Sequence, residues 1–122
     1  MKRLLCLLVI LSVAATFYSC EREEDFDEIL LIGKWKQISG PPPVLYYRYD
    51  TNGGGVTWNP DEGYNESNGQ KFTWKLVQSE LTQIHLMEVG STNITFIFIV
   101  TELTATTLKY KDQFDSWSFT RI

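Results

Sequence analysis

The stretch KFTWKL, residues 71–76, alternates polar and bulky apolar residues over its whole length. Successive side chains of a β-strand point to opposite faces, so this pattern places Phe72, Trp74 and Leu76 on one face and leaves the other face polar. A helix would spread the same three residues around its surface. The segment therefore predicts a strand with one buried face, the usual unit of an antiparallel sheet.

Similar short segments occur on both sides of this strand, separated by turn residues. The turns include GPPP at 40–43 and TNGGG at 51–55, where proline removes ladder donors and glycine tolerates positive φ. Strands are expected, in chain order, over 31–39, 44–50, around Val56 and Trp58, over 71–76, 81–88 and 93–101, around Leu108 and Tyr110, and around Trp117 and Phe119. At most, residues 27–32 form one turn of helix before the first strand.

Eight consecutive short strands with hairpin-sized connections predict an all-β domain. An up-and-down antiparallel barrel satisfies them best, because closure removes both exposed edges. A two-sheet sandwich remains the structural alternative, since periodicity alone does not distinguish the two.

Two of the expected strands carry specific predictions about their faces. In 81–88, Ile84 and Leu86 are expected to face the core, and Gln83, His85 and Met87 the solvent. The strand at 93–101 is apolar on both faces, so its outer residues, including Ile97 and Ile99, are expected to be covered.

The interior of such a barrel either is filled by side chains or holds one small ligand. The bulky aromatics of these short strands favour a filled barrel with an almost wholly apolar interior. If a ligand cavity exists, five aromatic residues are the candidates for its lining: Tyr47, Trp58, Trp74, Phe96 and Trp117.

The chain begins with a segment of a different character. Lys2 and Arg3 precede an apolar run from residue 4 to 17, followed by Tyr18, Ser19 and Cys20. A basic start, a short apolar stretch and a small residue before a cleavage point are typical of a secretory signal peptide, here residues 1–19. The run is too short for a membrane-spanning helix.

Cys20 follows a small residue at the end of the apolar run, and this arrangement resembles the lipobox of bacterial lipoproteins. The resemblance implies cleavage before Cys20 and acyl chains on its thiol, which would anchor the protein to a membrane. An ordinary secretory peptide, leaving a free thiol at position 20, is the alternative.

An acidic stretch follows the cysteine. Residues 21–28 hold six of the fifteen acidic residues of the chain and one of its eleven basic ones. Residues 20–29 are therefore predicted to be a solvated tether, followed by one barrel domain over 30–122. An acidic cluster at this place also looks like the export signal of Bacteroidota lipoproteins, which implies the outer face of the outer membrane, with a periplasm-facing location as the alternative.

Gly33-Lys34-Trp35, at the start of the first strand, resembles the Gly-x-Trp signature of lipocalins and related calycin barrels. The passage 100–109 is similar to one found in small lipocalin-like lipoproteins of Bacteroidota. The resemblance implies that Trp35 closes one end of the barrel and packs against an arginine of the last strand, where Arg121 stands. It also implies a small apolar or amphipathic ligand.

Two functions remain open, and neither is enzymatic. One is a ligand-binding barrel; the other is a solid barrel that docks another envelope protein as an inhibitor or accessory subunit. A near-neutral body disfavours nucleic-acid binding. His85, the single histidine, makes a poor metal site by itself, and no catalytic residue, metal ligand or cofactor is predicted.

Overall fold

The computed structural model describes residues 25–87 and 92–122. The predicted signal peptide, Cys20 and most of the acidic tether lie outside the described residues. The described part contains eight strands and two short 3-10 helices, η1 (Glu28–Leu31) and η2 (Pro60–Glu62).

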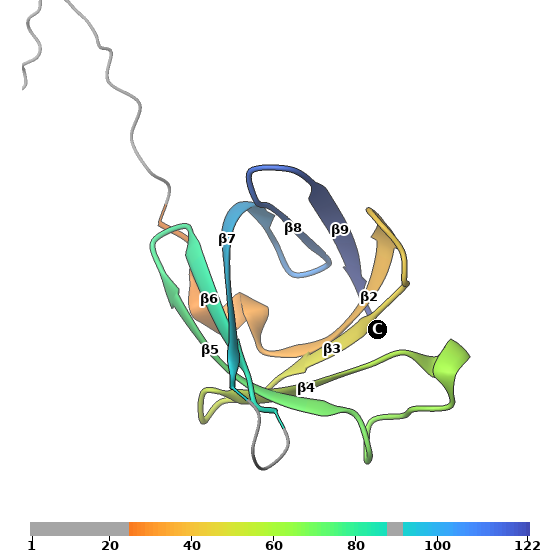
Figure 1. Ribbon diagram of the computed structural model, residues 1–122. Coiled ribbons are helices and arrows are strands. Elements are labelled where there is room, and N and C mark those ends of the chain that lie inside the picture. The colour runs from red at the N-terminus through yellow and green to blue at the C-terminus, as the bar shows by residue number, and fades with distance from the viewer. Residues whose placement is uncertain (1–24, 88–91) are drawn as a thin grey trace, which may run out of the picture.

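The eight strands form one closed barrel in which each strand pairs with its neighbours in the chain and β9 returns to β2. Every pairing is antiparallel, so the predicted up-and-down barrel is confirmed and the sandwich is excluded (Figure 1). The strands are β2 (Gly33–Ser39), β3 (Tyr46–Tyr49), β4 (Gly54–Trp58), β5 (Gln70–Val77), β6 (Glu80–His85), β7 (Ile94–Leu103), β8 (Thr107–Lys111) and β9 (Ser116–Arg121).

Helix η1 closes one end of the barrel. Asp27 caps it by accepting a hydrogen bond from the backbone N–H of Ile29, and Leu31 at its end is completely buried. Phe26, in the segment predicted as tether, packs against the core and donates its backbone N–H to Gln78. The sequence 26–32 is therefore a plug for the barrel rather than a free linker.

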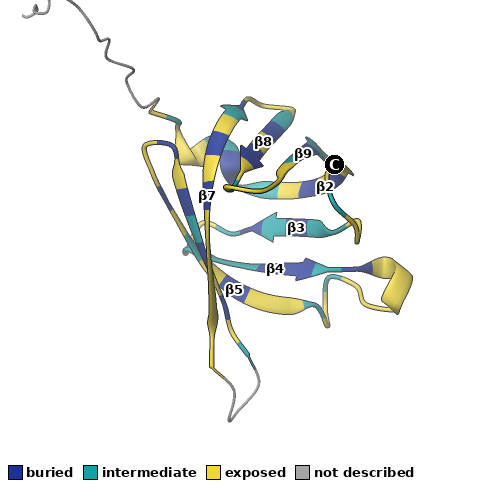
Figure 2. Ribbon diagram, turned by 45° about the horizontal axis from the view of Figure 1, so that its top comes forward, coloured by how far each residue is buried: buried dark blue, intermediate teal, exposed yellow. Residues whose placement is uncertain are grey.

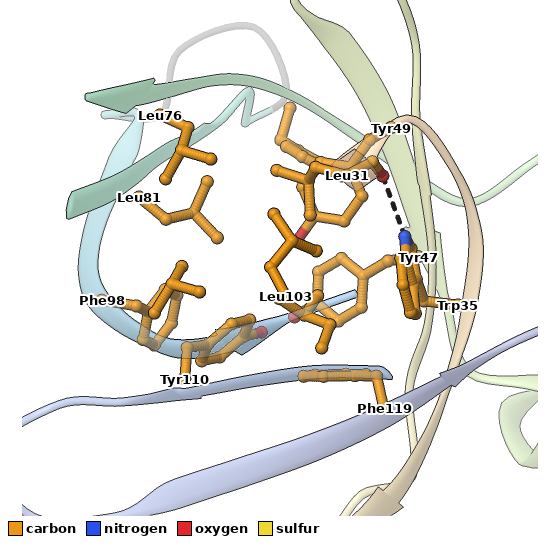
Figure 3. Packing of buried hydrophobic residues seen from close by; sticks show 13 residues of the cluster. Leu31, Trp35, Tyr47, Tyr49, Leu76, Leu81, Phe98, Leu103, Tyr110 and Phe119 are labelled. Atoms are coloured by element: carbon orange, nitrogen blue, oxygen red, sulfur yellow. Dashed lines mark hydrogen bonds between the residues drawn. The ribbon is translucent and has the colours of Figure 1, made fainter. Parts of the chain in front are cut away.

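The core fills the half of the barrel next to this plug. Its buried side chains come from all strands except β4: Leu31, Trp35, Tyr47, Tyr49, Phe72, Leu76, Leu81, Phe98, Val100, Leu103, Leu108, Tyr110 and Phe119. Figure 3 shows these side chains converging from opposite walls of the barrel. The ordinary alternation of strand side chains thus produces a single apolar centre at the closed end.

The prediction for the faces of β6 is wrong. Gln83 and His85 point into the barrel and are 0% and 6% exposed, whereas Ile84 lies on the outer face. The pairing of Gln83 with Trp74 and of His85 with Phe72 shows why, because directly opposed residues share a face. The expectation of an almost wholly apolar interior is wrong for the same reason.

The outer face of β7 is uncovered among the described residues. Ile97 and Ile99 are 53% and 39% exposed, so the expected cover is not found among the described residues, and Figure 2 colours much of β7 as exposed. The pairing of β7 with β8 begins only at Ile99, so residues 94–98 have β6 as their one strand neighbour.

Candidate functional site

The end of the barrel opposite η1 is open and contains a cavity of about 1180 Å³. Drug-sized ligands occupy pockets of about 300–1,000 Å³, so the space is large enough for such a molecule. Its walls come from all eight strands and from the loops at the mouth. The side chains that line it include Gln37, Tyr47, Thr57, Gln83, His85, Phe96, Phe98, Tyr110 and Trp117.

The floor of the cavity is a buried polar network. Gln83 donates from Nε2 to the hydroxyl of Tyr49 over 2.8 Å, and its Oε1 lies 2.9 Å from Nε2 of His85. The Tyr110 hydroxyl also interacts with Tyr47 and with Gln83. Figure 3 shows the rings of Tyr47 and Tyr110 approaching each other from opposite walls. Buried polar groups need such partners, so the network allows the interior of the barrel to hold them.

Burial keeps the ionisable groups of this floor uncharged near neutral pH. It raises the pKa of the Tyr110 phenol well above its ordinary value, and it raises the pKa of Tyr47 as well. It also lowers the pKa of His85 below 6.5, because the imidazolium form loses hydration. A neutral His85 that donates from Nε2 to Gln83 cannot also donate from Nδ1, which lies 3.3 Å from Oε1 of Gln70.

One wall of the cavity is a row of aromatic rings on β7, β8 and β9. Phe98 stacks on Tyr110 with ring centres 4.2 Å apart and meets Trp117 edge to face at 5.3 Å. Phe96 lies next in the row, 6.0 Å from Phe98, and is 41% exposed at the mouth. Rings in such contact prefer offset or edge arrangements, and an added ring from a ligand could extend the row in the same way.

The long polar loop between β4 and β5 forms one side of the mouth. Glu62, Tyr64 and Asn68 border the cavity, while Glu66 is held 3.1 Å from Lys34 and from Arg48 on the outer wall. The hydrogen bond from Arg48 and that from Lys34 lower the pKa of the Glu66 carboxyl. Glu66 therefore attaches the loop to the barrel.

The predicted cavity residues are not all in the cavity. Tyr47, Phe96 and Trp117 line it, and Trp58 borders it from the end of β4 while stacking on Tyr46 with ring centres 5.6 Å apart. Trp74 does not line it, because its indole packs against Tyr49 and donates to the carbonyl of Gly54 over 2.8 Å.

Sequence reasoning missed the polar members of the site. Thr57, Gln83 and His85 all face inward and line the cavity. For Gln83 and His85 the signal was present in the alternation of β6, where they stand at every second position after Leu81, which is also buried. Polar residues at every second position after a buried leucine are compatible with a strand whose inward-facing side chains border water or a ligand.

The structure brings Trp35 and Arg121 together at the closed end. The Arg121 guanidinium carbon lies 4.4 Å from the centre of the Trp35 ring. The indole of Trp35 donates to the carbonyl of Leu31 over 2.9 Å, the dashed line in Figure 3. This pair fixes η1 to the barrel and takes no part in the cavity.

Among residues 25–87 and 92–122, no cluster of three or more His, Cys, Asp or Glu side chains is placed to hold a metal ion. The same residues contain no helix that is long and apolar enough to span a bilayer. Comparison with protein families, curated proteins and solved structures finds no match for this chain.

Proposed function

We propose that this protein is a lipid-anchored envelope lipoprotein whose barrel binds a small apolar or amphipathic molecule in its open end. The observation that carries the ligand part is the cavity of about 1180 Å³, which has Tyr47, Gln83 and Tyr110 at its floor and aromatic rings along one wall. Well-formed, mostly apolar pockets with a few convergent polar groups are the usual form of small-molecule sites. The resemblance of residues 33–35 to lipocalins supports the same assignment.

The ligand part is tested with the neutral fluorophore N-phenyl-1-naphthylamine and a matched pair of variants. Phe96→Ala removes a ring from the cavity wall, and Phe114→Ala removes an 81% exposed ring from the β8–β9 loop outside the cavity. We expect saturable binding by the wild type and by Phe114→Ala, and affinity weakened about tenfold in Phe96→Ala because about 1–1.5 kcal/mol of ring contact is lost. Equal affinities in the two variants would place the probe elsewhere.

The anchoring part rests on the sequence around Cys20, which lies outside the described residues. Two or three acyl chains on one cysteine give stable membrane attachment, since each buried CH₂ contributes about 0.8 kcal/mol. We expect the wild type to take up labelled palmitate and to partition into detergent, and Cys20→Ser to do neither. A Cys20→Ser chain that is still labelled would disprove lipidation at this residue.

Placement on the cell surface is tested separately. Added protease is expected to digest the barrel on intact cells of the host. Digestion that requires a broken outer membrane would show that the barrel faces the periplasm.

A second function, docking of another envelope protein, is favoured by one observation. Ile97 and Ile99 on the outer face of β7 are exposed beside Phe114, and one side of residues 94–98 has no partner strand within 25–87 and 92–122. Exposed apolar patches and unpaired strand edges are both typical of surfaces that bind other proteins. Ile97→Lys is expected to abolish this docking and to leave probe binding in the cavity unchanged, which separates the two functions.

A further inference from the structure

The charge of the cavity limits what it can bind. All side chains at its floor are uncharged near neutral pH: Tyr47, Gln83, His85 and Tyr110. They are between 0% and 6% exposed, so a group placed against them leaves bulk water. A buried ion without an opposite charge is strongly unfavourable. A charged end group of a ligand therefore finds no side chain of opposite charge among these floor residues.

The described residues at the rim of the cavity also carry no net positive charge that would attract an anionic ligand. Among the lining residues that the structure describes there is one lysine, Lys71, against three carboxylates, Glu62, Asp112 and Asp115. The side chain of Lys71 is exposed and belongs to the outer face of β5, opposite Val56 of β4. The excess of negative charge at the rim therefore repels ligands that carry a carboxylate, sulfonate or phosphate group.

The wall and the floor indicate the shape and polarity of the preferred molecule. The rings of Phe96, Phe98 and Trp117 form a wall with stacked and edge-on contacts, which suits a flat ring system. At the floor, the Tyr110 hydroxyl keeps one of its three hydrogen-bonding sites beside its contacts with Tyr47 and Gln83, and Gln83 Oε1 keeps a second lone pair after its contact with His85.

We propose that the molecule bound here is an uncharged ring compound, which packs a flat face on the wall formed by Phe96, Phe98 and Trp117 and directs a hydrogen-bonding group toward Gln83 and Tyr110. This assignment rests on the proposed ligand-binding function and adds the chemical class of the ligand. Fatty acids and other amphiphiles with an anionic head are excluded as preferred ligands.

Two probes that differ by one charged group test the assignment. N-phenyl-1-naphthylamine is neutral, and 8-anilinonaphthalene-1-sulfonate carries the same rings with an added sulfonate. Fluorescence titration of the wild-type barrel near neutral pH is expected to give at least tenfold tighter binding of the neutral probe. Binding of both probes must be weakened by Phe96→Ala and not by Phe114→Ala, which assigns the signal to the cavity.

The outcomes separate this inference from the function on which it rests. Cavity binding of the sulfonate with equal or higher affinity would overturn the charge selectivity and leave a ligand-binding barrel. Absence of cavity binding by either probe would overturn both.

A matched pair of lysine variants provides a second measurement. Thr57 faces the cavity near the mouth, whereas Thr73 lies exposed on the outer face of β5. Thr57→Lys supplies the missing cation and is expected to tighten sulfonate binding at least fivefold, while Thr73→Lys leaves it unchanged. Sulfonate affinity that is unaffected in a folded Thr57→Lys variant would show that charge does not control the selectivity. If Thr57→Lys does not fold, the wild-type titration decides alone.

Discussion

The guanidinium of Arg121, one residue from the end of the chain, stacks on the indole of Trp35 at the start of the barrel with 4.4 Å between guanidinium carbon and ring centre. The same guanidinium donates to the backbone carbonyls of Leu30, Ile32 and Ala105. It thereby satisfies carbonyls at the end of η1 and in the β7–β8 turn, and joins the first and last elements of the barrel.

Removing this guanidinium should destabilise the whole barrel. Arg121→Met keeps the aliphatic stem but loses the stacking and the three donors, so we expect a loss of about 2–4 kcal/mol in the free energy of unfolding. Urea denaturation measures it. Lys109→Met is the control, because the ion pair of Lys109 with Glu102 is about half exposed and 3.6 Å long, and its loss should cost less than about 1 kcal/mol. Equal losses in both variants would contradict the role of Arg121.

Gly33 leaves room for that arginine. It has φ +133°, and a Cβ built at Gly33 would collide with Nη1 of Arg121. Gly33→Ala should therefore combine backbone strain with displacement of the guanidinium, at about 2–4 kcal/mol. Gly63→Ala is matched in having a positive φ, +84°, but has open space around its Cβ, so only the backbone term of about 1–2 kcal/mol is expected. Thermal unfolding that ranks Gly63→Ala as the more damaging change would show that the collision is unimportant.

The closed end could be predicted from sequence more fully than the mouth. Gly33 and Trp35 carry a recognisable local signature, and the apolar side chains of β5 leave one choice of inner face, since Phe72 and Leu76 have to be buried. In β6, by contrast, each of the two faces contains residues that are suitable for a core. Ile84 was predicted to be inside because it is apolar, but the cavity makes an inward polar residue such as Gln83 acceptable.

The missing information was the register between β6 and its neighbours. A shift of one residue would exchange the two faces of the strand, and the sequence of a single strand does not state its register. The same holds for Thr57, which faces inward because it pairs with Tyr47 rather than with Tyr46. The cavity lining depended on such pairings, so it could be predicted only in part.

Gln83 should contribute to stability as well as to the floor of the cavity. Gln83→Leu is similar in volume but leaves the hydroxyl of Tyr49 and Nε2 of His85 without their partner. Buried donors and acceptors that lose a partner cost about 1–3 kcal/mol, which urea denaturation of the variant measures. Gln113→Leu, at an exposed position in the β8–β9 loop, should change the free energy of unfolding by less than about 0.5 kcal/mol. An unchanged stability of Gln83→Leu would mean that water replaces the lost amide.

His85 should make the barrel less stable in mild acid. Burial lowers its pKa in the folded protein below the ordinary 6.5, so near pH 6 the unfolded chain binds a proton more readily than the folded one. Stability rises with pH wherever the unfolded state holds more protons, and it therefore falls as the pH is lowered through about 6.5. His85 is the single histidine of the chain, and carboxylates titrate mainly below pH 5, so the decrease between pH 7.5 and 5.5 should come from this side chain.

The variant His85→Phe keeps the stacking on Phe72, whose ring centre lies 5.2 Å from that of His85, but it cannot take up a proton. Its free energy of unfolding, measured by denaturation across the same pH range, should be nearly constant, even if its value at pH 7.5 is lower than that of the wild type. A slope that survives in His85→Phe would assign the acid sensitivity to another group. A wild type that becomes more stable on acidification would mean that the folded barrel stabilises the imidazolium form of His85, against the uncharged floor on which the ligand assignment depends.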